Sequence, residues 1–258
     1  MVKAIPSILA QIVEQKKLDL AHRAPGVEEL ADKSTAGRRD FAGALTSRQP
    51  AVIAEIKKAS PSRGVLAAQF DPAGIARLYQ QGGASALSVL TDEKHFQGSL
   101  ADLESARSAV SLPVLRKDFT IDPYHVQEAA AHGADAILLI AAILSERQMR
   151  DFRELAERYG MAALVEVHDA EELKPAVASG ARIIGVNNRD LNTFEVSLDT
   201  ALRLAEKIPA GVVKVAESGI HNTADVARLR AAGYQAFLVG EHLMKSGDPA
   251  GALQALLA

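Results

Sequence analysis

The stretch HGADAILLI, residues 132–140, contains the pattern that decides the fold: a glycine that ends a helix, small or polar residues, then an apolar run. Three further segments repeat this pattern, namely GGASALSVL from Gly82, SGARIIGVN from Ser179 and AGYQAFLVG from Ala232. From Gly83 through Gly133 and Gly180 to Gly233, the aligned glycines are 50, 47 and 53 residues apart. Regular steps of this length indicate a repeated unit of supersecondary structure.

Four other apolar runs alternate with these segments and complete a set of eight predicted strands. They are AVIAEIKK (51–58), LPVLRKDF (112–119), MAALVEVH (161–168) and GVVKVAESG (211–219). Amphipathic helical patterns fill the intervals, at 72–81, 100–110, 123–132, 146–159, 170–179, 198–207, 223–232 and 249–257. Five of these helices follow a residue that favours a helix start: Asp71, Asp122, Ser145, Asn222 and Asp248.

Apolar strands that alternate with helices favour a parallel sheet covered by helices, which places the chain in the α/β class. Eight such units in about 200 residues predict a closed (β/α)8 TIM barrel that forms one domain over residues 1–258. A doubly wound open sheet is the alternative. It is disfavoured because no G-x-G-x-x-G motif follows the first strand.

Residues 1–50 precede the repeat and predict an N-terminal helical extension within the same domain. Apolar residues at helical spacing, from Ile8 through Ile12 to Leu20, predict one helix. Two short helical stretches are expected at 27–30 and 41–45. Two hypotheses follow for this extension: it closes the bottom of the barrel, or it forms a lid near the site.

The composition limits the classes of partner. The chain has 258 residues, a formal net charge of −3, a pI near 6.2 and no cysteine. It lacks the basic field that nucleic-acid binding requires, and its longest apolar run, 136–144, is too short to span a bilayer. With no signal-peptide pattern at its start, we expect a cytoplasmic protein without nucleic-acid or membrane partners. The oligomeric state is left open, and a monomer is compatible with the sequence.

Charged residues stand at the ends of alternate predicted strands. They are Glu55 and Lys57 on the first strand, Lys117 on the third, Glu166 on the fifth and Glu217 on the seventh. The alternation of side chains in a strand directs these groups to the barrel interior, and reacting groups of such barrels lie at the C-terminal ends of the strands. A self-neutralising ion network is the alternative, but five charges at one mouth favour an active site.

Strands six to eight end in residues of a different kind. Asn187 and Arg189 follow the sixth, and Gly219 and Gly240 follow the last two, where TIM barrels often bind a phosphate through backbone N–H groups. Arg189 is a candidate clamp for a carboxylate or, alternatively, a partner in a surface ion pair. The histidines show no metal-binding spacing, so we interpret them as loop or surface residues and expect neither metal nor cofactor.

Together, several motifs resemble the indole-3-glycerol phosphate synthase family along essentially the whole chain. They are ILAQIVEQKKLDLA (8–21), AEIKKASPSRG (54–64), SVLTDEKHFQGS (88–99), LPVLRKDF (112–119), GADAILLI (133–140), LVEVHD (164–169), IGVNNRDL (184–191) and VAESGI (215–220). The resemblance implies a phosphorylated small-molecule substrate, 1-(2-carboxyphenylamino)-1-deoxyribulose 5-phosphate. It implies a lyase of tryptophan biosynthesis that closes a ring and then releases carbon dioxide and water.

The resemblance also implies roles for individual residues. Lys117 matches the general acid, Glu166 and Lys57 match the pair that assists loss of the hydroxyl, and Glu55 and Glu217 match positioning carboxylates. Residues that match substrate contacts are Ser60, Asn187, Arg189 and Ser218, with Phe96 and Phe119 as apolar walls or as ordinary core residues. Residues that match the phosphate site are Ser218, Gly219, Gly240 and Glu241, with the carboxylate of Glu241 expected to turn away from the anion.

Two alternative functions remain beside the lyase that the resemblance implies. A Schiff-base aldolase on the same fold would use Lys117 or Lys57 as a nucleophile. A non-catalytic sensor of a phosphorylated ligand would not need an acid and a base. The chain ends with its eighth predicted helix, so we expect no second barrel with isomerase activity, which some relatives carry.

Overall fold

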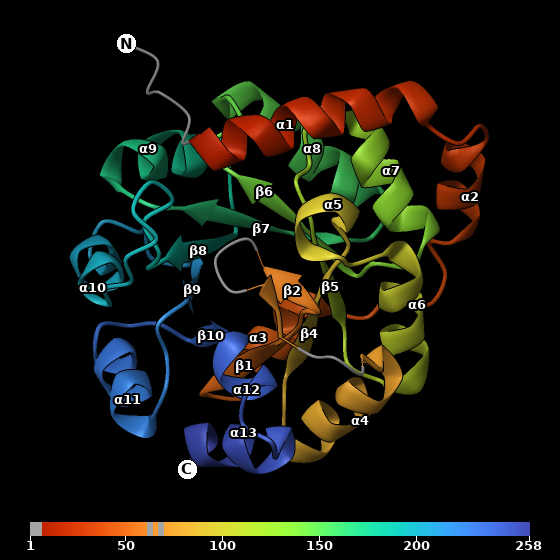
Figure 1. Cartoon of the computed structure of the whole chain (residues 1–258). Coiled ribbons are helices and arrows are strands. Elements are labelled where there is room, and N and C mark those ends of the chain that lie inside the picture. Colours follow the sequence, from red (N-terminus) through yellow and green to blue (C-terminus); the bar gives the residue numbers. More distant parts are fainter. Residues whose placement is uncertain (1–6, 61–63, 67–69) are drawn as a thin grey trace.

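A closed barrel of parallel strands lies at the centre of the molecule (Figure 1). The computed structural model describes residues 7–60, 64–66 and 70–258. The strands, in their order around the barrel, are β1 (Ala51–Ile56), β10 (Ala236–Val239), β9 (Val213–Glu217), β8 (Ile183–Asn187), β7 (Ala162–Val167), β6 (Ala136–Ile140), β5 (Val114–Lys117) and β4 (Ala86–Leu90). Because β4 pairs in parallel with β1, the ring closes, and the predicted (β/α)8 barrel is confirmed.

Helices surround this barrel, one after each strand, as Figure 1 shows. They are α4 (Pro72–Gly82), α6 (Leu100–Ala109), α7 (Pro123–Ala131), α8 (Glu146–Arg158), α9 (Ala170–Ala178), α10 (Asp199–Ala205), α11 (Thr223–Ala231) and α13 (Pro249–Leu257). All five predicted helix starts are capped by the expected side chain; the Ser145 hydroxyl, for example, accepts from the backbone N–H of Gln148. The repeated glycines all have left-handed backbones, with φ of 92°, 83°, 81° and 93° at Gly83, Gly133, Gly180 and Gly233, which explains their regular spacing.

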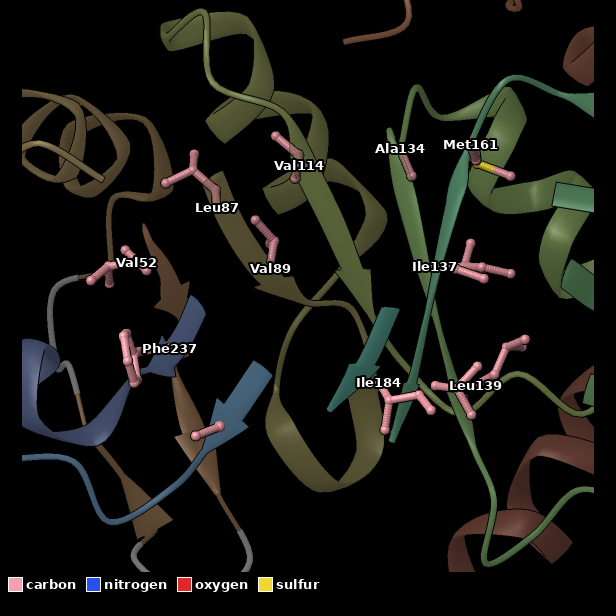
Figure 2. Packing of buried hydrophobic residues seen from close by; sticks show 14 of the residues in the cluster. Val52, Leu87, Val89, Val114, Ala134, Ile137, Leu139, Met161, Ile184 and Phe237 are labelled. Carbon is pink, nitrogen blue, oxygen red and sulfur yellow. The ribbon is translucent and has the colours of Figure 1, made fainter. Parts of the chain in front are cut away.

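Side-chain alternation in the strands divides the core into an outer and an inner cluster. The outer cluster lies between strands and helices and includes Val52, Val89, Val114, Ile137 and Phe237, which Figure 2 shows at close range. The inner cluster fills the barrel with the residues of opposite parity, among them Ile53, Leu115, Leu138, Leu164 and Leu238. Because both faces of every strand are buried, the strands read as continuous apolar runs in the sequence.

The N-terminal extension serves both ends of the barrel. Its first helix, α1 (Ser7–Asp19), followed by the 3-10 turn η1 (Leu20–His22), crosses the end where the strands terminate (Figure 1). The helix α3 (Phe41–Thr46) contacts β1, β4 and β9, and its Phe41 and Leu45 pack with Ala51 and Ala86 at the opposite end. The two hypotheses for this extension therefore apply to different helices: α3 closes the bottom, and α1 covers the mouth.

Between these two helices, α2 (Val27–Lys33) packs on the outside of the barrel against α7. Ala31 of α2 is buried in the outer cluster together with residues of α7, and polar groups that follow α2 add to this contact. The Ser34 hydroxyl and the Arg38 guanidinium both donate to the backbone carbonyl of Ala130, at 2.6 and 2.7 Å. This contact holds the chain against the barrel wall while it runs from the mouth to the bottom.

Three short elements in the loops at the mouth were not predicted. A hairpin of β2 (Ala59–Ser60) and β3 (Gly64–Val65) follows β1, α5 (Glu93–Phe96) follows β4, and α12 (Glu241–Met244) follows β10. Residues 61–63 of the SPSRG motif lie outside the described residues. Within the described part of the chain, no helix has the length and apolar character needed to cross a membrane.

Candidate active site

A pocket of about 470 Å³ opens at the mouth of the barrel. Every candidate residue named from the sequence lines it: Glu55, Lys57, Ser60, Phe96, Lys117, Phe119, Glu166, Asn187, Arg189, Glu217, Ser218, Gly219, Gly240 and Glu241. These residues come from the ends of β1, β5, β7, β8, β9 and β10, from the loops that follow them and, for Phe96, from α5 after β4. Because all the strands are parallel, their C-terminal ends meet at one rim, and the predicted convergence of charges occurs there.

Lys117, the last residue of β5, lies at the centre of the charged groups. Its Nζ atom is 2.9 Å from Oε2 of Glu166 on β7 and 3.6 Å from Oε2 of Glu217 on β9. Asn187, the last residue of β8, donates from Nδ2 to the other carboxylate oxygen of Glu166 at 3.3 Å. Glu166 therefore has partners on both oxygens, whereas no donor of the described residues lies in hydrogen-bond geometry to the buried Oε1 of Glu217.

Burial and charge separate the proton affinities of these groups. Burial opposes the charged form of Lys117, but the carboxylates of Glu166, Glu217 and Glu55 outweigh it and raise the lysine's pKa. Burial also opposes the ionised form of Glu166, yet Lys117 and His168 hold the pKa of this carboxyl well below its usual range. For Glu217, burial and the negative charge of Glu166 act together and raise the pKa to about 8. The site thus combines a lysine that favours its ammonium form, a carboxyl that favours ionisation and a second carboxyl that favours keeping its proton.

A second ion pair lies on β1 and directly after it. Lys57 donates from Nζ to Oε1 of Glu55, whose side chain is almost fully buried. The carboxylate of Glu55 occupies the space beside Gly240, where a Cβ atom would overlap it. Gly185 on β8 leaves space for the carboxylate of Glu217 in the same way. These two glycines are therefore required by close approach of a buried carboxylate, which adds a reason for Gly240 beyond phosphate binding.

Arg189 and Glu241 occupy another part of the pocket wall. The guanidinium of Arg189 lies 3.6 Å from Oε2 of Glu241 and donates to the backbone carbonyl of Phe194 at 3.3 Å. Glu241 also pairs with Lys245 at 2.7 Å. The side chain of Glu241 is thus directed to two cations. Arg189 has an ion-pair partner within the protein, which agrees with the alternative interpretation of Arg189 as a member of an ion pair.

The backbone after β9 adopts an uncommon conformation. Ser218 and Gly219 have φ of 67° and 77°, and both lie in the left-handed region. A non-glycine residue rarely adopts such an angle unless its surroundings hold it there. The Asn188 amide donates to the backbone carbonyl of Ser218 at 3.1 Å and contributes to this restraint. The loop that carries two candidate phosphate ligands is therefore held in one shape by its neighbours.

Much of the remaining pocket wall is apolar, although Asp118, His221 and His242 also line it. The rings of Phe96 and Phe119 lie with their centroids 6.0 Å apart, tilted by 35°. Ile8, Leu9 and Ile12 of α1 line the pocket, although the sequence reading named none of them as site residues. The sequence shows these apolar residues at helical spacing, which predicted the helix. The spacing did not indicate which end of the barrel the helix covers.

The loop after β8 contributes three further lining residues that the sequence reading missed: Leu191, Phe194 and Val196. Phe194 and Val196 are each 39% exposed, and Phe194 has a left-handed backbone with φ of 60°. These three apolar residues lie in a loop directly after a strand that ends in candidate site residues. That position in the sequence could have identified them as lining residues.

A buried ionic cluster attaches α1 to the barrel. Lys16 of α1 lies 2.7 Å from Asp118, which follows β5, and 3.2 Å from Asp92, which follows β4. Arg116 approaches Asp118 from the outer side of β5 at 3.1 Å. Asp118, which pairs with Lys16 of α1, directly follows Lys117 in the chain. The ion pair that attaches α1 therefore lies at the end of the same strand as the central lysine.

The interpretation of the histidines as loop or surface residues was wrong for His125, whereas His168 does lie in a loop, although its side chain is largely buried there. His125 lies on α7 and is 7% exposed, and its Nδ1 accepts from the backbone N–H of Ile121 at 3.2 Å. His168 follows β7, with Nε2 3.3 Å from Glu166 and Nδ1 2.9 Å from Glu172. Sequence spacing tests for metal motifs, and it does not detect a histidine buried beside a carboxylate. Among the described residues, no group of three or more metal-ligating side chains is placed to hold a metal ion.

The fold resembles solved structures of other TIM-barrel enzymes at low sequence identity. Thiamine phosphate pyrophosphorylase from Pyrococcus furiosus aligns with a TM-score of 0.61 and 18% identity over 80% of this chain and 93% of its own. The N-acetylmannosamine-6-phosphate 2-epimerase from Clostridium perfringens aligns with a TM-score of 0.63 and 15% identity over 79% and 91%. At these identities the likeness concerns the fold alone.

Sequence relatives are far more similar. A protein of Albidiferax ferrireducens named indole-3-glycerol phosphate synthase is 51% identical over 97% of this chain and 98% of its own length. One of the same name from Koribacter versatilis is 48% identical over 97% and 99%, and one from Polaromonas naphthalenivorans is 56% identical over 84% of each chain. The family profile described as indole-3-glycerol phosphate synthase matches residues 9–256. The chain belongs to the indole-3-glycerol phosphate synthase family.

Proposed function

We propose that the pocket at the barrel mouth binds 1-(2-carboxyphenylamino)-1-deoxyribulose 5-phosphate and converts it into indole-3-glycerol phosphate. Family membership makes the chain an enzyme of indole-3-glycerol phosphate synthesis, a decarboxylating lyase of tryptophan biosynthesis. The observation that carries the assignment of residues is the set of Lys117, Glu166 and Glu217, which are in contact and differ strongly in proton affinity.

Lys117 is proposed as the general acid of ring closure. In this step the ring carbon that bears the carboxylate attacks the ketone carbon of the ribulose chain, and the ketone oxygen becomes a hydroxyl by taking a proton. The raised pKa of Lys117 keeps a proton on Nζ in the resting enzyme. Decarboxylation then returns the electron pair of the breaking C–C bond to the ring and restores its aromaticity.

Glu166 and Lys57 are proposed for the dehydration that follows. The hydroxyl leaves as water after it takes a proton, and a proton is lost from the methylene carbon beside the nitrogen, which forms the second double bond of the indole. Glu166 is held as a carboxylate and can accept a proton, whereas Lys57 carries ammonium protons beside Glu55. We propose Glu166 as the base and Lys57 as the acid of this step.

The two ends of the substrate fit different parts of the pocket. We assign the aromatic ring to the walls formed by Phe96 and Phe119 together with the apolar face of α1. We assign the phosphate to backbone N–H groups at Ser218, Gly219 and Gly240, because the side chain of Glu241 is occupied by Lys245 and Arg189. Ser60 and Asn187 remain as candidates for the hydroxyl groups between them.

A Schiff-base aldolase is disfavoured by the charge of the central lysine. A nucleophilic lysine must be a neutral amine, which usually requires a desolvated site or a neighbouring cation that lowers its pKa. Lys117 instead lies among carboxylates that raise its pKa. Borohydride treatment in the presence of substrate is therefore expected to leave no covalent label on Lys117 or Lys57.

The test of the function is a fluorescence assay for indole-3-glycerol phosphate formed from the synthetic substrate. Continuous appearance of indole fluorescence with release of carbon dioxide supports the proposal, and binding of substrate without turnover would favour the non-catalytic sensor. We further propose a cytoplasmic location, since the sequence contains no cysteine and the reaction belongs to amino-acid biosynthesis.

A further inference from the structure

The imidazole of His168 lies between two buried carboxylates, one inside the candidate site and one behind it. Its Nε2 atom is 3.3 Å from Oε1 of Glu166, and its Nδ1 atom is 2.9 Å from Oε2 of Glu172 on α9. The backbone N–H of His168 donates to the same oxygen of Glu172 at 2.8 Å. Glu172 thus fixes both the backbone and the ring of His168, and the ring then faces Glu166.

The doubly protonated ring suits both neighbours best. A neutral imidazole carries one N–H group, so one of its nitrogens would direct a lone pair at a carboxylate oxygen. The imidazolium donates from Nδ1 to Glu172 at 2.9 Å and places its positive charge 3.3 Å from Glu166, at ion-pair distance and outside hydrogen-bond geometry. Burial opposes this charge, but Glu166 and Glu172 outweigh the burial and raise the pKa of His168 to about 10.

We propose that His168 is a positioning residue that holds Glu166 as an ionised carboxylate in a fixed orientation against Lys117. The inference rests on the proposed role of Glu166 as the base of the dehydration. The order of groups is Glu172, His168, Glu166 and Lys117, with alternating charge from α9 across β7 to β5. Two cations and the Asn187 amide then hold the two oxygens of Glu166.

This arrangement decides which of the two neighbouring carboxyls keeps a proton. Glu166 is faced by Lys117, Asn187 and His168, and Glu217 by Lys117 and the negative charges of Glu166 and Glu55. The other groups that face His168 are Glu172 on α9 and Asp190 in the loop after β8. The imidazolium therefore favours the ionised form of Glu166 and leaves the proton on Glu217, whose raised pKa agrees with this distribution. Without the imidazolium, Glu166 competes with Glu217 for that proton, so Glu166 is ionised in a smaller fraction of the molecules.

The first test is His168→Gln, which keeps a donor beside Glu166 and removes the positive charge. We expect the acid limb of the pH profile of kcat/KM to move to higher pH by on the order of one unit, because Glu166 loses a cationic neighbour. The matched control is His132→Gln, which removes a histidine that pairs with Glu104 at 2.7 Å on the surface. The control is expected to leave the profile unchanged.

The second test reads the charge of His168 without using activity. The ring nitrogen signals of His168 in the wild-type protein are expected to remain those of an imidazolium throughout pH 6–8. The variant Glu172→Gln keeps the shape of α9 and removes one carboxylate, so the same signals are expected to titrate at a lower pH. The acid limb of its kcat/KM profile is expected to move to higher pH by less than in His168→Gln.

Three results would overturn the inference. The first is a wild-type His168 signal that titrates near pH 6.5. The second is a His168→Gln profile whose acid limb coincides with that of the wild type. The third is a fall in activity matched by a fall in melting temperature with an unchanged pH profile, which indicates a structural role only. Failure of the indole assay would instead refute the proposed function, while the nuclear magnetic resonance experiment would still report the charge of His168.

Discussion

The two ends of the barrel interior are built from the same strands but serve opposite purposes. At the bottom, Ala51 and Ala86 meet Phe41 and Leu45 of α3, and all four are buried apolar residues. At the mouth, the same strands and their neighbours end in Glu55, Lys117, Glu166 and Glu217. The bottom stabilises the fold by burial of apolar surface, whereas the mouth concentrates buried charges that a fold without a function would avoid.

The N-terminal extension follows the same division. Phe41 of α3 is 1% exposed and completes the inner cluster at the bottom. Leu9 and Ile12 of α1 belong to the same inner cluster, but they also line a pocket that retains open volume. The difference teaches that similar apolar stripes on two helices of this extension have different consequences. Loss of the α3 residues should cost folding free energy alone, whereas loss of the α1 residues should also alter the site.

The largest expected effect tests the bottom of the barrel. Phe41→Ala should lower the free energy of unfolding by about 3–5 kcal/mol, because it leaves a cavity in a packed interior. Urea unfolding measures this loss, and kcat per folded molecule should stay close to that of the wild type. The matched variant at the mouth is Phe194→Ala, which removes a ring that is 39% exposed and should change KM more than stability. A similar loss of stability in both variants would contradict the division between the two ends.

The second prediction tests the central group of the mouth. Lys117→Ala should lower kcat by on the order of 10² or more, as expected when a general acid is lost. Lys117→Arg keeps a cation for the neighbouring carboxylates but is a poor acid at neutral pH, so it should show a comparable loss. Steady-state kinetics by indole fluorescence measures both.

The control for these lysine variants is Lys58→Ala. Lys58 follows Lys57 with opposite strand parity, and it does not line the pocket. Near-normal turnover is expected for this variant. Near-normal turnover of Lys117→Ala would exclude the assigned role of Lys117.

The third prediction concerns the pH dependence of stability. Glu217 has a pKa of about 8 in the folded protein, above the ordinary carboxyl value of 4.5. Between these two values the folded state binds more protons than the unfolded state, so this group lowers stability as the pH rises, with a limiting slope of about 1.4 kcal/mol per pH unit. His168, whose folded pKa of about 10 exceeds 6.5, acts in the same direction above pH 6.5.

Glu217→Gln should therefore flatten the decline in stability between pH 5 and pH 8. Urea unfolding of the wild type and the variant at several pH values in this window measures the two slopes. Parallel curves for both proteins would show that Glu217 is ionised in the folded state.

The smallest expected effect concerns the attachment of α1. Lys16→Met keeps most of the side-chain volume but removes the cation between Asp118 and Asp92. We expect weaker docking of the helix by about 1 kcal/mol, seen as roughly a fivefold rise in KM and faster proteolytic cleavage near the start of the chain. The control is Lys17→Met, which removes an exposed pair with Glu14. An equal change in both variants would indicate a general effect of charge rather than loss of the attachment.

Much of the architecture could be predicted because its signals are local. The glycines with left-handed backbones, the capping residues and the apolar strands depend on each residue's own conformational preferences, so they repeat visibly along the chain. Strand parity also placed Glu55, Lys117 and Glu166 on the inward face, because alternation is a property of any strand. The roles of these residues remain predictions.

Other features depend on contacts between distant segments. The position of α1 over the mouth depends on Lys16 reaching two aspartates about 75 and 100 residues away, and no local pattern encodes that pairing. The burial of His168 between Glu166 and Glu172 likewise appears only when β7 and α9 are in place. The hairpin of β2 and β3 was missed because each strand has only two residues.

By itself, the sequence determined the barrel, its strand parity and the identity of the groups that reach the mouth, because periodicity and capping act over a few residues. Only the tertiary structure decided which end each N-terminal helix covers, which carboxyl has the raised pKa and which histidine lies between two carboxylates. Those properties arise from burial and from charges brought together by folding, and the proton affinity of a group depends on neighbours that the chain order does not reveal.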